Sequence, residues 1–218
     1  MKNIPRIFVD QEIESGVQVP IARDVSHYLS RVMRTNECLA FNSGIEYFAH
    51  LTDDGRFLSI GEKTSHVDPS NNITLMFAPI KRTDDLINMA TQMGVAKFQP
   101  VITDRTNANH INWERMKKIA IEASEQSNRN SVPQILSPIK FSEINLSDIV
   151  FADERAAYGH NTYDIPSGVK NILVGPEGGF SDSEFVALDN AGAHGISLGK
   201  TILRAEVASV IALAKVIK

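Results

Sequence analysis

Short apolar runs separated by turns make up the first 63 residues of the chain. They predict strands at residues 6–9, 17–20, 38–42, 45–52 and 56–61. Residues 42–44 and 53–55 combine Asn or Asp with a following glycine, a composition typical of hairpin turns. Between the second and third strands, Val25, Leu29 and Val32 share one face of residues 22–33, which predicts a helix. This part of the chain is therefore expected to be a small β-rich module.

The spacing of apolar positions changes after residue 72. Strands are predicted at residues 73–79, 98–102, 149–153, 172–174 and 195–198, and helices at residues 84–93, 112–127, 182–191 and 203–216. Such alternation is typical of an α/β layer built on a largely parallel sheet. The polar segment 62–72 predicts a linker with its boundary near Asp68, so we expect two domains, at residues 1–68 and 69–218.

The composition is that of an ordinary globular protein. The 218 residues include 22 Lys and Arg against 26 Asp and Glu, which gives a net charge of −4, and 43% of them are hydrophobic. This balance argues weakly against a nucleic-acid partner, because phosphate binding needs only a local basic face. Cys38 is the only cysteine, which excludes an internal disulfide, a thiolate zinc cluster and an iron–sulfur centre and fits a reducing compartment.

Location and metal content follow from simple absences in the sequence. The apolar runs are too short to span a membrane, and the acids at positions 10, 12 and 14 do not suit a signal peptide. A cytoplasmic location is therefore expected. The six histidines show no ligand spacing, so no metal site is predicted.

The most informative stretch is residues 171–184, Asn-Ile-Leu-Val-Gly-Pro-Glu-Gly-Gly-Phe-Ser-Asp-Ser-Glu. An apolar strand runs into a turn with three glycines, and Ser181 with Glu184 forms a capping box that begins a helix. Glycines let backbone amides approach a ligand closely, and a helix N-terminus favours anionic groups. The alternative is a tight turn without a ligand, but three glycines, a proline and a glutamate in five positions favour a ligand loop.

A second glycine-bounded stretch, residues 195–204, matches two known motifs only in part. Residues 195–199 spell G-x-S-x-G, but no histidine follows Ser197, which excludes a hydrolase nucleophile. Residues 199–201 imitate the end of a phosphate-binding P-loop, yet His194 stands where its first glycine is required. The last predicted helix carries an apolar stripe that is expected to face a core or a partner subunit: Leu203, Val207, Val210, Ile211 and Ala214.

Cations stand at the ends of several predicted elements. Arg204 lies in the first turn of the last predicted helix, where the helix dipole disfavours a positive charge. Its placement indicates either contact with an anion or a developing negative charge, or a salt bridge with Glu206. Such end positions carry functional groups in α/β proteins, although they are also ordinary solvated surface. The other cations at element ends are Lys81, Arg82, Arg105 and Arg129.

Taken together, these stretches resemble the RsmE-like family, methyltransferases of the SPOUT superfamily that modify N3 of a uridine in 16S ribosomal RNA of the small subunit. The matching segments follow the family order over nearly the whole chain: residues 6–9, 27–34, 90–95 with Pro100 and 104–106, 122–129, 173–180, 198–199 and 202–204. The chain departs from the family pattern at Ala205 and Val207, where threonines are common, and at residues 89–92, where Lys-Ala-Thr-Glu is common.

The resemblance implies a small PUA-like β-barrel that helps to hold RNA, followed by an α/β domain whose C-terminus forms a trefoil knot. It also implies a homodimer and S-adenosylmethionine as the methyl donor. The residues expected to bind this cofactor are Leu173, Val174, Gly175, Pro176, Glu177, Gly178, Leu198, Gly199, Ile202 and Leu203. Arg204 is expected to be catalytic, and RNA is expected to contact Arg31, Arg34, Arg105 and Arg129.

Two other functions remain compatible with the sequence. A related knotted enzyme would methylate a ribose 2′-hydroxyl, whereas a non-catalytic RNA-binding factor of ribosome assembly would keep the fold without the reaction. If RNA is the partner, the net charge of −4 predicts a local basic cleft on an otherwise acidic surface, and RNA binding that salt weakens.

Overall fold

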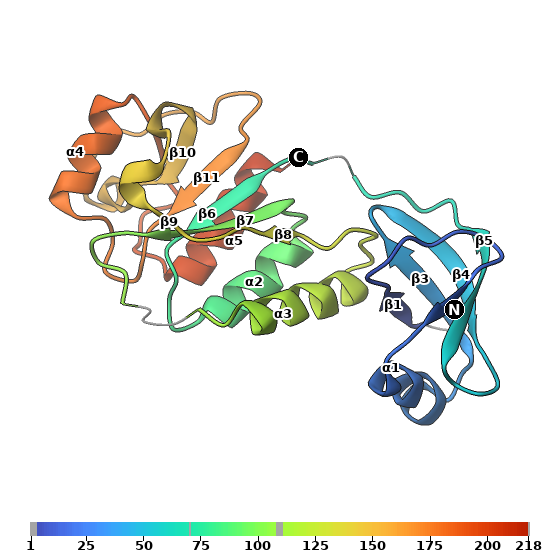
Figure 1. Ribbon diagram of the computed structural model, residues 1–218. Coiled ribbons are helices and arrows are strands. Elements are labelled where there is room, and N and C mark those ends of the chain that lie inside the picture. The colour runs from blue at the N-terminus through green and yellow to red at the C-terminus, as the bar shows by residue number, and fades with distance from the viewer. Residues whose placement is uncertain (1–3, 70, 108–110, 218) are drawn as a thin grey trace. The chain divides into compact units, whose positions relative to one another are not determined.

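The computed structural model describes residues 4–69, 71–107 and 111–217 (Figure 1). The chain divides into two compact units, one formed by Met1–Pro69 with Ile121–Val132 and the other by Ser70–Ala120 with Pro133–Lys218. The sequence pattern assigned residues 121–132 to the second domain. They belong to the first unit because hydrogen bonds join them to residues more than a hundred positions earlier in the chain.

Within the described residues of the first unit, five strands form one sheet in the order β1-β3-β4-β5-β2. Their bounds are Arg6–Phe8, Gln18–Pro20, Glu37–Asn42, Ile45–Leu51 and Phe57–Lys63 for β1 to β5. The β1 and β3 strands are parallel, and the other neighbours are antiparallel. The predicted helix corresponds to α1 (Arg23–His27), which continues as a π-helical segment, η1 (Tyr28–Met33). The five strands predicted for this segment are therefore present.

A buried charged network attaches residues 121–132 to the sheet of the first unit. Arg6 and Glu46 form an ion pair at 2.9 Å, and each side chain is less than a tenth exposed. The Arg6 guanidinium also donates hydrogen bonds to the carbonyl of Ser124, at 3.1 Å, and to Oδ1 of Asn130. Buried charges are tolerated when they are paired and hydrogen-bonded, so the three partners of Arg6 make this network a single structural feature of the unit.

The second unit is an α/β layer, as predicted. Its sheet has the order β12-β10-β11-β6-β7-β8, and β9 pairs with β7. The strands are β6 (Thr74–Phe77), β7 (Lys97–Ile102), β8 (Gln134–Ile135), β9 (Ile139–Lys140), β10 (Ile149–Ala152), β11 (Asn171–Val174) and β12 (His194–Ile196). Each strand pair found among the described residues of this unit is parallel. The sequence pattern missed β8 and β9, because two residues are too few to show a period.

Four α-helices of the described chain belong wholly or in part to this unit: α2 (Thr83–Gln92), α3 (Trp113–Gln126), α4 (Asp182–Asn190) and α5 (Ala205–Val216). Short 3₁₀ segments add η2 (Phe141–Glu143), η3 (Leu146–Asp148) and η4 (Glu154–Tyr158). In Figure 1, α5 crosses behind β6 and β7; it packs against α2 and β11. In the described residues, no helix combines the length and apolar character that a membrane crossing requires.

The last helix differs from its prediction in two respects. It begins at Ala205, and Arg204 is its N-cap with extended backbone (φ −67°, ψ 150°) instead of a residue of the first turn. The stripe was predicted to face a core or a partner subunit, and the core of this chain does not bury Val207, which is 39% exposed. The side chains that α5 buries are Ala205, Glu206, Ala208, Ser209, Ala212 and Leu213. Because α5 is apolar nearly all round, periodicity cannot select a face, and close packing against α2 favours the smaller side chains.

Candidate functional site

A cavity of about 270 Å³ opens at the carboxyl ends of β10 and β11. This is the edge at which parallel α/β sheets bind their ligands. Its walls are η4, the glycine turn at residues 175–179, and residues 198–203 with the start of α5. Most of the residues predicted to bind a cofactor line it, namely Val174, Gly175, Pro176, Glu177, Gly178, Leu198, Gly199, Ile202 and Leu203.

The other two residues predicted for the reaction lie next to this cavity without lining it. Leu173 is fully buried in the core of the second unit, one position before the cavity wall. Arg204 follows the lining residue Leu203, and its side chain is exposed. Sequence analysis missed several lining residues, among them Asp153, Glu154 and Tyr158. Their signal was available, because Asp153 ends the predicted strand 149–153 and the other two follow it, at the functional edge of a parallel sheet.

The glycine turn has a shape that side chains would disturb. A Cβ atom at Gly175 would come within 3.1 Å of the Phe180 ring, and one at Gly179, where φ is +69°, would collide with the Glu154 carboxylate. The capping box predicted after this turn is present. Glu184 N donates to Ser181 Oγ at 3.3 Å, and Ser181 N donates to a Glu184 carboxylate oxygen at 2.8 Å. The turn therefore runs close to its neighbours and directly into a capped helix.

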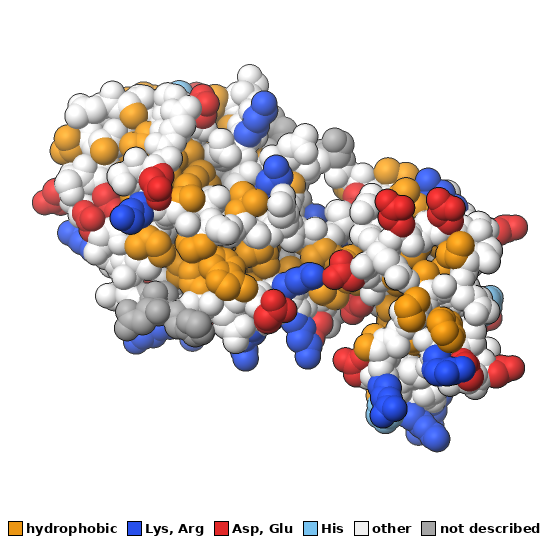
Figure 2. Space-filling model, in the orientation of Figure 1, with side chains coloured by type: hydrophobic (Ala, Val, Ile, Leu, Met, Phe, Trp, Pro, Cys, Tyr) orange, Lys and Arg blue, Asp and Glu red, His pale blue; other side chains and the backbone are white. Residues whose placement is uncertain are grey.

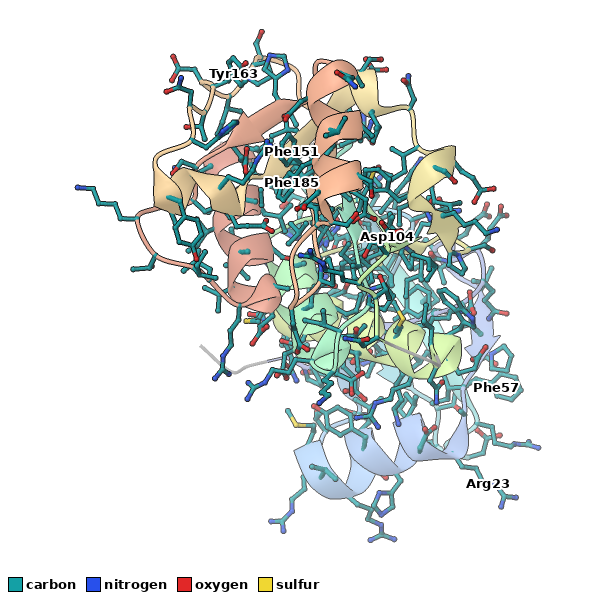
Figure 3. All side chains as sticks on the ribbon, turned by 90° about the vertical axis from the view of Figure 1, so that its left-hand side faces the viewer. Arg23, Phe57, Asp104, Phe151, Tyr163 and Phe185 are labelled. Atoms are coloured by element: carbon teal, nitrogen blue, oxygen red, sulfur yellow. The ribbon has the colours of Figure 1, made fainter. Side chains whose placement is uncertain are left out.

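The loop that follows β7 holds the glycine turn from outside. Arg105 Nη1 donates hydrogen bonds to the carbonyls of Gly178, at 2.9 Å, and Phe180, at 3.0 Å. Asp104, labelled in Figure 3, accepts a hydrogen bond from the Ser181 hydroxyl, and its backbone N–H donates to Glu184 at 2.9 Å. Arg105 was predicted to bind RNA, and the structure shows that one of its nitrogens also shapes the cavity wall.

An arginine clamp fixes the opposite wall, η4. Arg155 bonds both carboxylate oxygens of Asp153 and both of Asp189 at 2.8–2.9 Å, and its guanidinium lies 4.1 Å from the centroid of the Phe185 ring. Phe185 in turn packs against Phe151, with ring centroids 6.5 Å apart (Figure 3). The hydrogen bonds from Arg155 lower the pKa of Asp189, and those to the two carboxylates raise the pKa of Arg155. The end of β10 is thereby tied to α4.

The cavity is acidic and apolar. Asp153, Glu154 and Glu177 are among its described lining residues, and none of these lining residues is Lys or Arg. Glu154 accepts a hydrogen bond from the Phe180 N–H at 3.2 Å, and burial raises the pKa of its carboxyl group. Tyr158, which is 83% exposed, stands at the rim. Such a lining disfavours a phosphate group and suits a small molecule that joins a cationic part to an apolar part.

The residues predicted to contact RNA have different surroundings. Arg31 and Arg34 are exposed on η1 and at its end, and Arg34 adopts a left-handed conformation (φ 53°). Arg23 of the preceding α1 points away from its helix into solvent (Figure 3), and Figure 2 shows Lys and Arg side chains gathered where α1 lies. Arg129 is half-buried, donates to Ser131 Oγ at 3.4 Å, and has its pKa lowered by burial. The exposed arginines at α1 and η1 therefore form the more accessible cationic surface.

Fold and cavity together define an α/β domain with a cavity at the ligand-binding edge of its sheet. Residues 68–217 match the RNA methyltransferase domain family. Over 229 aligned positions the chain is 34% identical to Ribosomal RNA small subunit methyltransferase E from Rickettsia conorii, covering 97% of this chain and 94% of that protein. A protein of the same name from Aquifex aeolicus is 29% identical, and the match covers 94% of this chain and 95% of that protein. The chain belongs to this RsmE family of RNA methyltransferases, as the sequence motifs predicted.

Solved structures agree with this assignment. The crystal structure of a Ribosomal RNA small subunit methyltransferase E from Neisseria gonorrhoeae bound to S-adenosyl methionine has a TM-score of 0.84 and 30% identity, and the match covers 97% of this chain and 96% of that chain. A methyltransferase from Legionella pneumophila shares the fold with a TM-score of 0.80 at 23% identity. Among the described residues, no three His, Cys, Asp or Glu side chains are grouped so as to hold a metal ion.

Proposed function

We propose that the chain transfers the methyl group of S-adenosylmethionine to N3 of a uridine in 16S ribosomal RNA of the small subunit. The observation that carries the proposal is the acidic and apolar cavity beside the glycine turn. A sulfonium cation joined to adenosine needs apolar walls for its ring and favours carboxylates over cations nearby. The relative that was crystallised with S-adenosyl methionine supports this choice of donor, and the N3 position follows from the family.

The donor would be held mainly by backbone groups. Gly175, Gly178 and Gly199 leave peptide groups accessible at the cavity wall, and Gly199 has a φ of +138°, a conformation open essentially to glycine alone. The apolar walls are Val174, Pro176, Leu198, Ile202 and Leu203, with Glu177 in the middle of the turn and Leu173 buried in the core below the strand end. When bound, the donor supplies a methyl group that its positive sulfur makes electrophilic.

The chain's own side chains would act on the acceptor. The imide nitrogen of uracil would lose its proton to water, and its lone pair would then form the nitrogen–carbon bond as the sulfur–carbon bond breaks and S-adenosylhomocysteine leaves with the electron pair on sulfur. No covalent enzyme intermediate is needed, so the protein contributes alignment and stabilisation of the negative charge on the ring. We assign the second task to Arg204. No carboxylate pairs with its side chain in the described part of the chain, and Glu206, its possible partner from the sequence, is instead 3.9 Å from Arg82.

Arg204→Ala tests this assignment. Loss of a group that stabilises developing charge typically slows turnover by about 10² to 10³. We expect a decrease of this order in single-turnover methyl transfer, with the affinity for S-adenosylmethionine by calorimetry changed less than about threefold. Arg115→Ala, which removes another exposed arginine of the same unit, is the control. Equal losses in rate and donor affinity, or no loss in either, would refute the role of Arg204.

The reaction itself is tested on ribosomal RNA from a strain that lacks the modification. Purified protein and S-adenosylmethionine are expected to produce 3-methyluridine, identified by mass spectrometry of the digested nucleosides. A ribose-methylated nucleoside would establish the knotted 2′-hydroxyl methyltransferase instead. Failure of the folded protein to bind S-adenosylmethionine in calorimetry would favour the non-catalytic ribosome-assembly factor.

Assembly and location complete the proposal. The outer face of α5 supports a homodimer, because Val207 and Ala214 are exposed, and Val210 and Ile211 only half-buried, within one chain. The five-stranded sheet with exposed Arg31 and Arg34 supports a PUA-like RNA-binding domain, and Arg105 and Arg129 are the further candidates for RNA contact. A trefoil knot in the second domain and a cytoplasmic location belong to the same proposal.

A further inference from the structure

A second cavity, of about 250 Å³, adjoins the donor cavity and shares Pro176 and Glu177 with it. Its other described walls come from the segments that leave β6 and β7, at residues 79–81 and at Arg105 and Asn107. Since β6 and β7 are parallel neighbours, their carboxyl ends lie at the same edge of the sheet. A ligand in this second cavity would be separated from a donor in the first by little more than the peptide segment 176–177.

The two cavities are lined by different charged side chains. The donor cavity is lined by carboxylates, whereas the second cavity is lined by the cations Lys81 and Arg105 with Glu177 as the acid. Lys81 is exposed, and no carboxylate lies within ion-pair distance of it among the described residues. Its neighbour Arg82 is different, because it lies 3.7 Å from Asp85 and 3.9 Å from Glu206. Of these two neighbouring cations, the one without a carboxylate partner is therefore the one that lines the second cavity.

Arg105 is held in position without an acidic partner. Its Nη1 atom bonds the carbonyls of Gly178 and Phe180, which fixes the guanidinium plane and leaves Nε and Nη2 without another protein partner in the described chain. A guanidinium that is already oriented loses less side-chain entropy when it binds an anion. Lys81 adds a point charge on a flexible stem, which is the usual complement to an arginine at a phosphate.

We propose that this second cavity, the phosphate subsite, binds the phosphodiester group next to the target nucleotide through Lys81 and Arg105. The inference rests on the proposed function, because it places the acceptor strand beside the donor. Phosphate contacts position a nucleic acid strand without reading its sequence, and they suit a small, exposed cationic cavity. The target base itself must approach the methyl group in the donor cavity, so its backbone is the part of the acceptor available to the adjoining subsite. Arg105 then links phosphate binding to the shape of the donor cavity through Gly178.

Lys81→Gln is the decisive variant, and Lys97→Gln is its matched control. Both lysines are exposed in the second unit, but Lys97 begins β7 and lies at the opposite end of that strand from the subsite. Binding of a small-subunit ribosomal RNA transcript, measured without S-adenosylmethionine over a range of KCl concentrations, should be weakened about tenfold at low salt by Lys81→Gln. The slope of log affinity against log salt should fall by about 1. Lys97→Gln should match the wild type in both.

Two further measurements show whether the subsite holds a phosphate of the RNA or the target base. With saturating RNA, Lys81→Gln should retain its single-turnover rate within about twofold and its affinity for S-adenosylmethionine, so the loss appears in the KM for RNA. Arg105→Gln should lower the affinities for both RNA and S-adenosylmethionine, because it also releases the turn carbonyls. An unchanged salt slope for Lys81→Gln would overturn the subsite. A reduced saturated rate with unchanged RNA affinity would also overturn it, since the cavity would then hold the base.

The subsite and the proposed function can fail separately. Salt-dependent RNA binding is measured without the donor, so it decides the subsite even if the wild-type protein transfers no methyl group. Conversely, 3-methyluridine formation with normal RNA binding by Lys81→Gln would support the function and reject the subsite. Thermal melting of each variant checks the fold, and little change is expected because Lys81 and Lys97 are both exposed.

Discussion

Replacing Arg155 with methionine removes the guanidinium that ties η4 to α4. Arg155 bonds Asp153 at the end of β10 and Asp189 in α4, and it lies over the ring of Phe185. Its side chain is 24% exposed and that of Asp153 only 1%, so this pair is largely shielded from water. Methionine retains much of the apolar length, and the variant therefore measures mainly the loss of the charged hydrogen bonds.

The expected loss of stability depends on how deeply each of the two ion pairs of Arg155 is buried. Removing one partner of a buried ion pair costs about 3 to 5 kcal/mol, because the other charge is left without compensation. Asp189 is 49% exposed, so its pair with Arg155 contributes less than about 1 kcal/mol. Since Arg155 keeps some contact with solvent, we expect the free energy of unfolding of Arg155→Met to fall by an amount near the lower end of this range, about 3 kcal/mol. In a chain of this length that corresponds to a decrease of about 6 to 12 °C in Tm.

The dependence on pH has a definite sign. Arg155 lowers the pKa of Asp189 in the folded protein, so the contribution of this pair is present above the unfolded value of about 3.9. It is lost as the pH falls from there through the lowered folded value. The difference in stability between the wild type and Arg155→Met should therefore become smaller below about pH 4.

Chemical denaturation followed by far-UV circular dichroism and by the fluorescence of Trp113, the single tryptophan, measures the loss in the second unit. Arg115→Met is the matched control, because its ion pair with Asp84 is exposed on both sides and should contribute at most about 1 kcal/mol. Calorimetry should also show weaker binding of S-adenosylmethionine by Arg155→Met, since Asp153 and Glu154 line the cavity. If the two variants lose equal stability and donor binding is unchanged, the clamp does not support the site.

Two other positions give independent tests. Gly199→Ala should lower donor affinity about tenfold, because a φ of +138° strains any residue other than glycine. No atom lies within 4 Å of the added Cβ, so a steric clash would not explain the loss. The control Gly168→Ala, at φ +76° in an equally open place outside the cavity, should leave donor affinity unchanged. Calorimetry on both variants decides this, and equal effects would contradict it. The Cys38 thiol is buried, which raises its pKa to about 12, so a thiol reagent at pH 8 should label it slowly in the native protein and rapidly in denaturant. Rapid native labelling would show that β3 opens.

Elements bounded by clear turn or capping residues were predictable from the sequence. The strands of the first unit are short and bounded by turn residues, and the capping box of Ser181 and Glu184 fixed the start of α4 to the residue. The cavity wall at residues 174–178 was predictable as well, because three glycines around Pro176 are unusual for a turn without a ligand. In each case the signal is local, so the sequence around the element contains the information.

Features that depend on distant residues were not predictable. The apolar period of α5 does not tell which face meets α2, and the buried face turned out to be that of Ala208 and Ala212. The partner of Glu206 is Arg82, which is 124 positions away, and not Arg204, which is two positions away. The bonds from Arg105 to the glycine turn span more than seventy residues. Such contacts arise only when the sheet brings the strand ends together.

The membership of residues 121–132 in the first unit has a consequence for synthesis. Arg6 emerges early, but its acceptor Asn130 follows 124 residues later. At a translation rate of about 5 to 20 residues per second, the nascent chain waits about 6 to 25 s before this buried network can close. Glu46 is the partner of Arg6 that is made first, and the acceptors at Ser124 and Asn130 are absent until the end of that interval. The first unit therefore cannot be completed until residues 121–132 have been made, after part of the second unit, and a fragment that stops at residue 69 would lack the Ser124 and Asn130 acceptors of Arg6 permanently.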